Sequence, residues 1–171
     1  DQFGIQDQFA FGWGNATATL RWNSILSDKL FMNVSTIYSD YKYNLGTPDD
    51  AETAFRLDSR IQNYIGNLSF NYFLNSKNKI DFGLNTTYYR FSPGKISGDI
   101  SVELSKEYAF EPAIYISNEQ TISDRFKLHY GLRYSTFFNL GPRTVVQYNS
   151  EDEIEPENVI GSTYYAKGET V

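Results

Sequence analysis

A two-residue alternation of side-chain character recurs in six stretches of this chain and constrains its fold more than any other feature. In residues 126–134 the even positions are Phe, Leu, Tyr, Leu and Tyr, whereas the odd positions are Lys, His, Gly and Arg. Because successive side chains of a β-strand point to opposite faces, such a stretch predicts a strand with one apolar and one polar face. The other five stretches are residues 14–22, 30–38, 64–74, 80–88 and 108–116.

The composition favours strands and argues against several functions. The chain has 14 Tyr and 13 Phe but one Met and no Cys, and aromatic side chains pack well on a pleated surface. We therefore expect no helix. The absence of Cys excludes a disulfide scaffold and the common zinc motifs. A net charge of −6 argues against a nucleic-acid partner, since phosphate binding needs clustered Lys and Arg.

Short and long connections alternate between the predicted strands. The short ones are residues 23–29, 75–78 and 121–125, and the long ones are residues 46–59, 92–105 and 139 onward. Outer-membrane barrels have short periplasmic turns and long extracellular loops. The strands, at roughly 9–13 residues, are close to the ~9–11 residues that cross a bilayer at a tilt. The pattern predicts an all-β protein with an antiparallel, up-and-down transmembrane β-barrel, of which about six strands are present.

Charge and aromatic residues are distributed over these strands as a membrane requires. Within them the even positions carry no Asp, Glu, Lys or Arg as far as Arg90, and an Arg or Lys facing lipid at mid-membrane costs roughly 2–4 kcal/mol. Trp and Tyr concentrate at the two interfaces of a membrane protein. Trp22 and Tyr72 fall near the short turns. Five tyrosines fall nearer the long loops, namely Tyr38, Tyr64, Tyr88, Tyr108 and Tyr134. Alternation alone favours a soluble β-sandwich whose core holds the aromatic residues, because soluble antiparallel sheets outnumber membrane barrels. Strand length, the unequal connections and the aromatic belts together favour the barrel instead.

Two blocks of sequence carry short motifs around the expected turns. The first is Phe11-Gly12-Trp13-Gly14-Asn15, Leu20-Arg21-Trp22-Asn23 and Ser27-Asp28-Lys29-Leu30-Phe31, continuing into Tyr38-Ser39-Asp40-Tyr41. The second is Glu111, Ala113, Tyr115, Asn118-Glu119, Ile122-Ser123-Asp124-Arg125-Phe126, Gly131-Leu132-Arg133-Tyr134-Ser135 and Phe137. Both blocks resemble the later barrel region of the TonB-dependent outer-membrane receptors. In that family such lines mark a strand that descends to the periplasm, its turn, and the strand that returns. The resemblance covers most of the chain in style and rests on scaffold motifs, which carry no information about a substrate.

We expect residues 1–171 to form part of one barrel domain. Residues 1–11 would be the end of an extracellular loop, residues 12–138 about six strands, and residues 139–171 another extracellular loop. Six strands are fewer than the roughly eight of the smallest single-chain barrels, and an open sheet in lipid would leave backbone groups unpaired at both edges. The chain is therefore read as an interior piece of a larger barrel, with no plug domain within it.

Six charged side chains at odd positions are candidates to line the lumen. A lone His without a second His, Cys or paired carboxylate is more often part of a polar lining than a metal ligand, which is how we interpret His129. Arg21 and Arg133 are expected to pair with lumen carboxylates or to contact a plug. The six candidates are Arg21, Asp81, Glu111, Lys127, His129 and Arg133.

Two long connections are acidic and are expected on the extracellular side as solvated loops. Carboxylates can gather hard cations, but the regular ligand spacing and tight Gly of a calcium loop are missing. We therefore expect no metal and no cofactor. The loop candidates are Asp49, Asp50, Glu52, Glu151, Asp152, Glu153, Glu155 and Glu157.

Two further expectations concern a proline and catalysis. Pro112 lies inside a predicted strand, where it removes a backbone donor, and this predicts a bulge or an irregular pairing there. The sequence has no Ser/His/Asp set that one rim could assemble, no phosphate-binding loop and no metal motif. We therefore do not expect an enzyme.

The resemblance implies part of an energy-coupled receptor in the outer membrane of a Gram-negative bacterium. Such a receptor imports a scarce nutrient, for example a siderophore, an oligosaccharide or a peptide. Its partners would be outer-membrane lipid, the rest of the barrel with a plug, an inner-membrane energy-coupling protein and, as in some members of that family, a surface lipoprotein. The first alternative is a passive porin or structural barrel, and the second is a soluble β-sandwich that binds glycans.

Overall fold

The computed structural model describes residues 10–47, 56–97, 102–149 and 158–171. These residues form strands and no α-helix, as the composition predicted. In particular, none of the described segments is a helix long and apolar enough to cross a membrane. The strands in chain order are β1 (Ala10–Ser27), β2 (Leu30–Gly46), β3 (Arg56–Asn75), β4 (Asn78–Ser97), β5 (Val102–Glu103), β6 (Glu107–Ser123), β7 (Phe126–Ser135), β8 (Phe138–Leu140), β9 (Arg143–Tyr148) and β10 (Val159–Tyr165).

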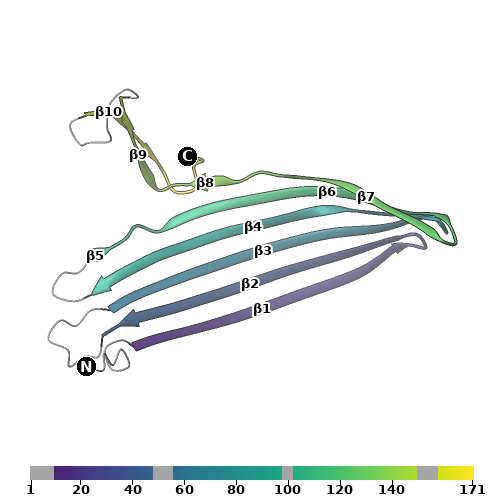
Figure 1. The fold of residues 1–171 in the computed structure, drawn as a ribbon, viewed down its shortest axis with the longest axis horizontal. Coiled ribbons are helices and arrows are strands. Elements are labelled where there is room, and N and C mark those ends of the chain that lie inside the picture. The colour runs from purple at the N-terminus through teal and green to yellow at the C-terminus, as the bar shows by residue number, and fades with distance from the viewer. Residues whose placement is uncertain (1–9, 48–55, 98–101, 150–157) are drawn as a thin grey trace, which may run out of the picture.

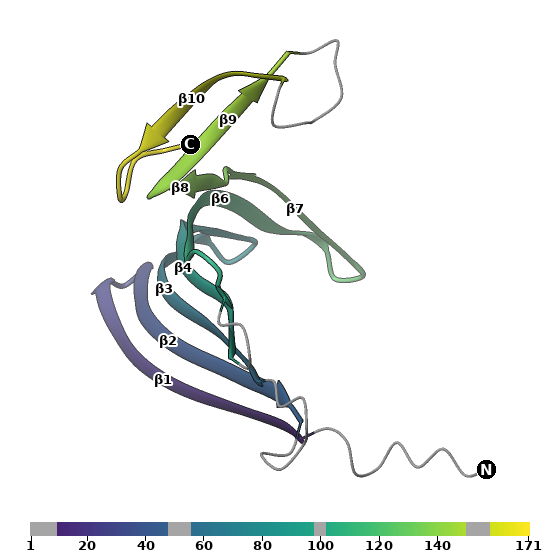
Figure 2. The same ribbon diagram turned by 90° about the vertical axis from the view of Figure 1, so that its left-hand side faces the viewer.

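One antiparallel, up-and-down sheet contains eight of these strands. Its order is β1-β2-β3-β4-β6-β7, with β5 paired to β4 and β8 paired to β6, while β9 and β10 form a separate hairpin. The long strands lie side by side as a single curved layer (Figures 1 and 2). Within the described residues the sheet is not closed, because β1 and β7 do not pair with each other. The predicted meander is confirmed, and the sheet has two free edges.

Between the bulges near the strand ends, the register places the even-numbered residues of the long strands on one face. Tyr38 lies opposite Tyr64, which lies opposite Tyr88. Near the β7 edge of the sheet, Ile116 lies opposite Leu132. Even pairs with even throughout the regular parts of the ladders, between bulges near the strand ends. Since a slip by one residue would reverse every side chain, this register defines two continuous surfaces, which we call the even face and the odd face.

Most strands are longer than the alternation predicted. The strands β1, β2, β3, β4 and β6 have 18, 17, 20, 20 and 17 residues, and only β7, with 10, stays within the expected range. The difference arises because the alternation is a side-chain signal. It ends near the tyrosines at positions 38, 64 and 88, whereas backbone pairing continues past them to Gly46, Arg56 and Ser97.

The three short turns are built alike. Each has two residues, at positions 28–29, 76–77 and 124–125, so that the turns recur every 48 residues along the chain. A register shift precedes each turn. Side chains of the residue before the turn accept hydrogen bonds from the backbone N–H of the second turn residue, at 2.9 Å from Lys77 to Asn75 and 3.4 Å from Lys29 to Ser27. Such Asx-type and Ser-type turns favour a tight reversal.

Successive turns are also staggered along the sheet. Ser27 lies opposite Leu30, which lies opposite Tyr72. The next turn begins after Asn75, three residues beyond Tyr72. Asn75 lies opposite Asn78, which lies opposite Gln120. The third turn begins three residues beyond Gln120, after Ser123. Each hairpin is therefore displaced by three residues relative to the one before it.

Pro112 leaves the register intact on one side and coincides with a break on the other. Toward β4 it lies opposite Thr86 without any shift, so the predicted bulge is wrong there. Toward the opposite side, β6 pairs with β7 as far as Ala113 and with β8 from Phe110 onward. The carbonyl of Pro112 accepts a bond from the N–H of Thr136 at 3.1 Å. Its missing N–H points to that same side, which explains why the ladder is interrupted between β7 and β8.

The region after residue 138, predicted as a long loop, contains its own β-structure. A bridge joins Leu140 to Thr170, and backbone bonds run from Gly141 N to Glu169 O at 2.8 Å and from Val171 N to Asn139 O at 2.9 Å. These bonds hold the last residues against β8. The β9–β10 hairpin lies beyond them, at the end of the sheet that bears the long connections (Figure 1).

Very little of the described chain is buried. Among the described residues, Ala109 and Ala113 are the only apolar side chains that are buried, and no large side chain is fully buried. Large apolar groups are exposed instead, among them Leu20 at 73%, Trp22 at 61% and Leu132 at 81%. A single layer of sheet, without a second layer packed on it, is the cause.

Candidate functional site: a charge-free band, a tyrosine row and a polar face

The even face carries a band without charged residues, bounded at one end by the short turns. From the turns to the tyrosines at 38, 64, 88 and 134, the even positions of the six long strands hold no Asp, Glu, Lys or Arg. A polar side chain within it, Asn118, donates from Nδ2 to the hydroxyl oxygen of Tyr130 at 2.9 Å. We call this surface the charge-free band.

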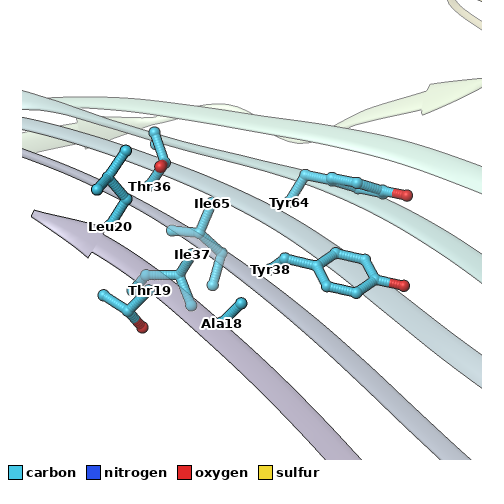
Figure 3. Close-up of a pocket in the computed structure, with 9 residues that line it drawn as sticks. Ala18, Thr19, Leu20, Thr36, Ile37, Tyr38, Tyr64 and Ile65 are labelled. Atoms are coloured by element: carbon cyan, nitrogen blue, oxygen red, sulfur yellow. The ribbon is translucent and has the colours of Figure 1, made fainter.

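Four tyrosines form a continuous row at the other boundary of the band. Ring centroids are separated by 5.1 Å between Tyr38 and Tyr64, 6.2 Å between Tyr64 and Tyr88, and 6.3 Å between Tyr88 and Tyr108. In Figure 3 the hydroxyls of Tyr38 and Tyr64 point the same way, away from the arrowhead of β1 and hence away from the short turns. These two tyrosines of the row thus present their polar ends toward the long connections.

A shallow apolar groove lies on the band next to this row. It has a volume of about 550 Å³. Small side chains at Ala18, Thr36 and Gly66 leave the space, which Leu20 and Tyr38 border (Figure 3). The remaining lining residues are Thr19, Ile37, Tyr64 and Ile65.

Charged residues appear on the even face only beyond the tyrosine row. Arg60 donates from Nε to Oδ1 and from Nη2 to Oδ2 of Asp40, both at 2.7 Å, and Lys42 lies 3.6 Å from the same carboxylate. These donors, the Arg60 hydrogen bonds first, hold the pKa of Asp40 below its usual value. Gln62 donates to the hydroxyl of Tyr38 at 2.7 Å. The tyrosine row therefore separates the apolar part of the even face from its charged part, and charged side chains follow within two to four residues of Tyr38 and Tyr64.

The odd face carries hydrogen-bonded polar ladders instead. In the first, Asn67 donates to Ser35 at 3.2 Å, Asn85 donates to Asn67 at 2.9 Å, and Arg133 donates to Asn85 at 2.7 Å. This ladder spans the sheet from β2 to β7. It gives the polar side chains along it hydrogen-bond partners within the protein.

A second ladder on the odd face lies nearer the short turns. Asn33 donates to Asn71 at 3.0 Å, and Asn71 in turn donates to Asp81. Lys79 lies 3.1 Å from the same carboxylate of Asp81. The two ladders make the odd face polar along most of its length.

The six candidates from the sequence share the odd face but do not form one compact cluster. Asp81 is held by Asn71 and Lys79, Glu111 accepts the hydroxyl proton of Tyr89 at 2.8 Å, and Lys127 lies 3.7 Å from Glu119. Arg133 donates a hydrogen bond to the side-chain amide oxygen of Asn85. Arg21 of β1 lies opposite Ser35 of β2, and His129 of β7 lies opposite Glu119 of β6.

Two of the candidates, His129 and Arg133, line one groove of about 430 Å³ on the odd face. The groove lies over Gly131, where a Cβ would meet the carbonyl oxygen of Ile116 at 2.6 Å. Tyr115 forms another wall and lies over Gly83, where a Cβ would come within 2.8 Å of the tyrosine hydroxyl. The sequence reading missed the part played by these glycines. The Gly-Leu pairs at 83–84 and 131–132, placed 48 residues apart, are the signal that could have revealed it.

The acidic loop candidates lie outside the described residues. These are Asp49, Asp50 and Glu52 in residues 48–55 and Glu151, Asp152, Glu153, Glu155 and Glu157 in residues 150–157. Among the described residues, no group of three or more His, Cys, Asp or Glu side chains is placed to hold a metal ion.

Comparisons with protein-family models, with curated proteins and with solved structures return no match. The arrangement of the faces is therefore the basis for a functional proposal.

Proposed function

We propose that this chain is part of a transmembrane β-barrel in a bacterial outer membrane, with the even face toward lipid and the odd face toward the lumen. The observation that carries the proposal is the charge-free band, which is continuous over six strands and ends at a row of tyrosines. Lipid-facing surfaces exclude charge, and Tyr and Trp concentrate at the membrane interfaces.

The stagger of the turns supports the same proposal. A displacement of three residues for every two strands, at ~3.3 Å per residue and ~4.8 Å between strands, brings the turns to one level when the strands tilt by about 45°. Strands of membrane barrels tilt by roughly 35–45°. A water-soluble sheet has no need to level its turns.

The same tilt brings Tyr134 to the level of Tyr64. Tyr134 is linked by the register, through Ile114 and Leu84, to Leu68, four residues from Tyr64 in the sequence. Three strands of tilt shift the level by about four to five residues, which brings Tyr134 to the height of Tyr64. From the turns to this height the strands rise roughly 25 Å, the usual thickness of the apolar band of outer-membrane barrels.

The near absence of a buried core favours a membrane over a soluble sandwich. A soluble domain of this length would bury most of its apolar side chains between two layers. Here large apolar side chains of the even face, such as Leu20, Trp22 and Leu132, are exposed. Lipid would cover them without a second layer of protein.

Within this proposal, the barrel serves as an energy-coupled importer of a scarce nutrient in a Gram-negative bacterium. The polar ladders and the groove beside His129 and Arg133 suit a water-filled path. Energy coupling, a plug and a surface lipoprotein rest on the sequence resemblance to TonB-dependent receptors. A passive porin is the alternative. In planar bilayers the full-length protein should stay closed if a plug fills it, whereas steady ion conductance would favour the porin.

The lipid-facing assignment is tested with two arginine substitutions in β1. Leu20 lies on the even face, near the middle of the charge-free band once the tilt is applied, and Thr17 lies on the odd face; both are exposed. Leu20→Arg should cost roughly 2–4 kcal/mol in lipid and reduce the folded, heat-modifiable form of the full-length protein in outer membranes. Thr17→Arg should leave it unchanged. Equal tolerance of the two substitutions would rule out the membrane assignment.

A further inference from the structure

A small pocket at the boundary of the charge-free band brings two cationic side chains together with three tyrosines. It has a volume of about 370 Å³ and is lined by Arg90, Lys167, Tyr64, Tyr88 and Tyr108. The four residues that come from strands β3, β4 and β6 all have even numbers and lie on the even face. No carboxylate is among the described residues that line it.

Lys167 reaches this pocket from the far end of the chain. It lies in the turn after β10, which backbone bonds hold against Gly141, with Gly168 N donating to Gly141 O at 3.2 Å. The neighbouring carboxylate of Glu169 accepts a hydrogen bond from the backbone N–H of Ala166. Glu169 is therefore engaged with the turn itself. The two cations come from separate segments, β4 and the turn, and face one space.

Arg90 has an unused donor. Its Nε is buried and has no hydrogen-bond partner among the described residues. A buried donor left unpaired costs about 1–3 kcal/mol, and an oxyanion in the pocket would supply the acceptor. A guanidinium matches the geometry of a phosphate, and a second cation nearby strengthens the attraction.

We propose that this pocket binds the phosphate of an anionic lipid headgroup in the leaflet at the long-connection end of the sheet. This inference rests on the proposed function, since it requires the even face to meet lipid. The pocket lies where a headgroup would lie, at the tyrosine row where the charge-free band ends. In helical membrane proteins, basic pockets at the membrane surface bind the headgroups of anionic lipids, and the pocket here has the same chemistry. A bound headgroup would bridge Arg90 and Lys167 and so fasten the C-terminal segment to the sheet.

The test uses the full-length protein in detergent, with phosphatidylglycerol added and the bound lipid counted by native mass spectrometry. The double variant Arg90→Gln/Lys167→Gln should bind phosphatidylglycerol at least tenfold more weakly than the unmodified protein. Arg90→Lys, which keeps the charge, should keep part of the affinity. The matched control is Lys127→Gln, because Lys127 lies on the odd face beside Glu119, and it should bind like the unmodified protein.

Two outcomes would overturn the lipid site. The first is equal affinity in the double variant and the control, with both proteins retaining the heat-modifiable mobility of a folded barrel. The second is binding of inorganic phosphate to the pocket as tight as that of phosphatidylglycerol, which would assign the pocket to a free anion and leave the lipid no part in recognition. Failure of the membrane proposal looks different, because Leu20→Arg and Thr17→Arg would then be tolerated alike. A failed lipid site leaves that difference intact.

Discussion

At the scale of single residues, glycines on the odd face make room for aromatic and backbone groups of the neighbouring strand. A Cβ at Gly83 would come within 2.3 Å of the carbonyl oxygen of Leu68 and 2.8 Å of the hydroxyl of Tyr115. The carbonyl is backbone and cannot turn aside. Gly14, in contrast, has no atom within 4 Å of the place where a Cβ would lie.

This difference gives a prediction for two Gly→Ala substitutions. Gly83→Ala should lower the free energy of unfolding of the full-length protein by about 1–3 kcal/mol, because overpacking forces the strands or Tyr115 to shift. Gly14→Ala should be neutral or slightly stabilising, since alanine restricts the unfolded chain. Urea unfolding followed by tryptophan fluorescence measures both. Equal losses would show that close packing at Gly83 is not the cause.

The ion pair beyond the tyrosine row gives a second prediction. Asp40 is buried and its carboxylate receives two bonds from Arg60, whose side chain is 42% exposed. Because solvent screens the exposed partner, we expect a coupling of only about 0.5–1 kcal/mol. A double-mutant cycle of Asp40→Asn and Arg60→Gln, measured by urea unfolding, gives this value. Strict additivity of the two substitutions would show that the pair contributes nothing.

The pair should also make stability depend on pH. The pKa of Asp40 is lowered in the folded protein, so its contribution is present above the ordinary carboxyl range near pH 4. The contribution is lost as pH falls through the lowered folded pKa. Asp40→Asn should therefore flatten the acid limb of the stability curve. An unchanged limb in that variant would assign the acid sensitivity to other carboxylates.

At the scale of the strands, the alternation of side chains predicted the existence, order and shared face of all six long strands. It succeeded because every strand has one face that excludes charge, a signal that needs no neighbour to be read. It did not predict where the strands end. Past Tyr38 and Tyr64 the even face turns polar, with Asp40, Arg60 and Gln62, and only backbone pairing reveals that the strands continue.

The candidate site was less predictable than the fold. Parity alone placed Arg21, Asp81, Glu111, Lys127, His129 and Arg133 on the odd face. Their partners depend on which residues of neighbouring strands lie opposite, and these follow from register. Asn85, which accepts a hydrogen bond from Arg133, lies 48 positions away in the sequence and carries no charge that would mark it as a partner. Register thus supplied what composition and spacing could not.

At the scale of the whole molecule, the two ends of the sheet differ in kind, and this difference predicts its orientation. The short turns lie at one end and the long connections at the other (Figure 1). If the proposed barrel follows the outer-membrane pattern, the short turns are periplasmic. Ser76 lies in the turn between β3 and β4, and Ser105 lies between β5 and β6; both are exposed.

Labelling of intact cells with a membrane-impermeant maleimide tests this orientation. Single Cys residues replacing Ser76 and Ser105 in the full-length protein should react differently, with the one at 105 labelled and the one at 76 protected. Labelling of both after the outer membrane is made permeable is the control for thiol accessibility. Labelling at 76 alone would invert the barrel and place the acidic connections in the periplasm.

The free edges of the sheet determine how this chain behaves on its own. The strands β1 and β7 each present a row of backbone groups that no described strand pairs, and the charge-free band exposes side chains such as Leu20 and Trp22 to water. Unpaired edges and large apolar patches promote association. In a complete barrel the edges would pair with further strands and lipid would cover the band.

The 171 residues expressed alone should therefore form oligomers or aggregates in aqueous buffer, and size-exclusion chromatography with light scattering measures this. Addition of a mild detergent should reduce the aggregation by covering the band, while the open edges still pair between copies. A soluble monomer that melts cooperatively without detergent would contradict the barrel proposal and favour the β-sandwich, because such behaviour requires a buried core that a lipid-facing sheet lacks.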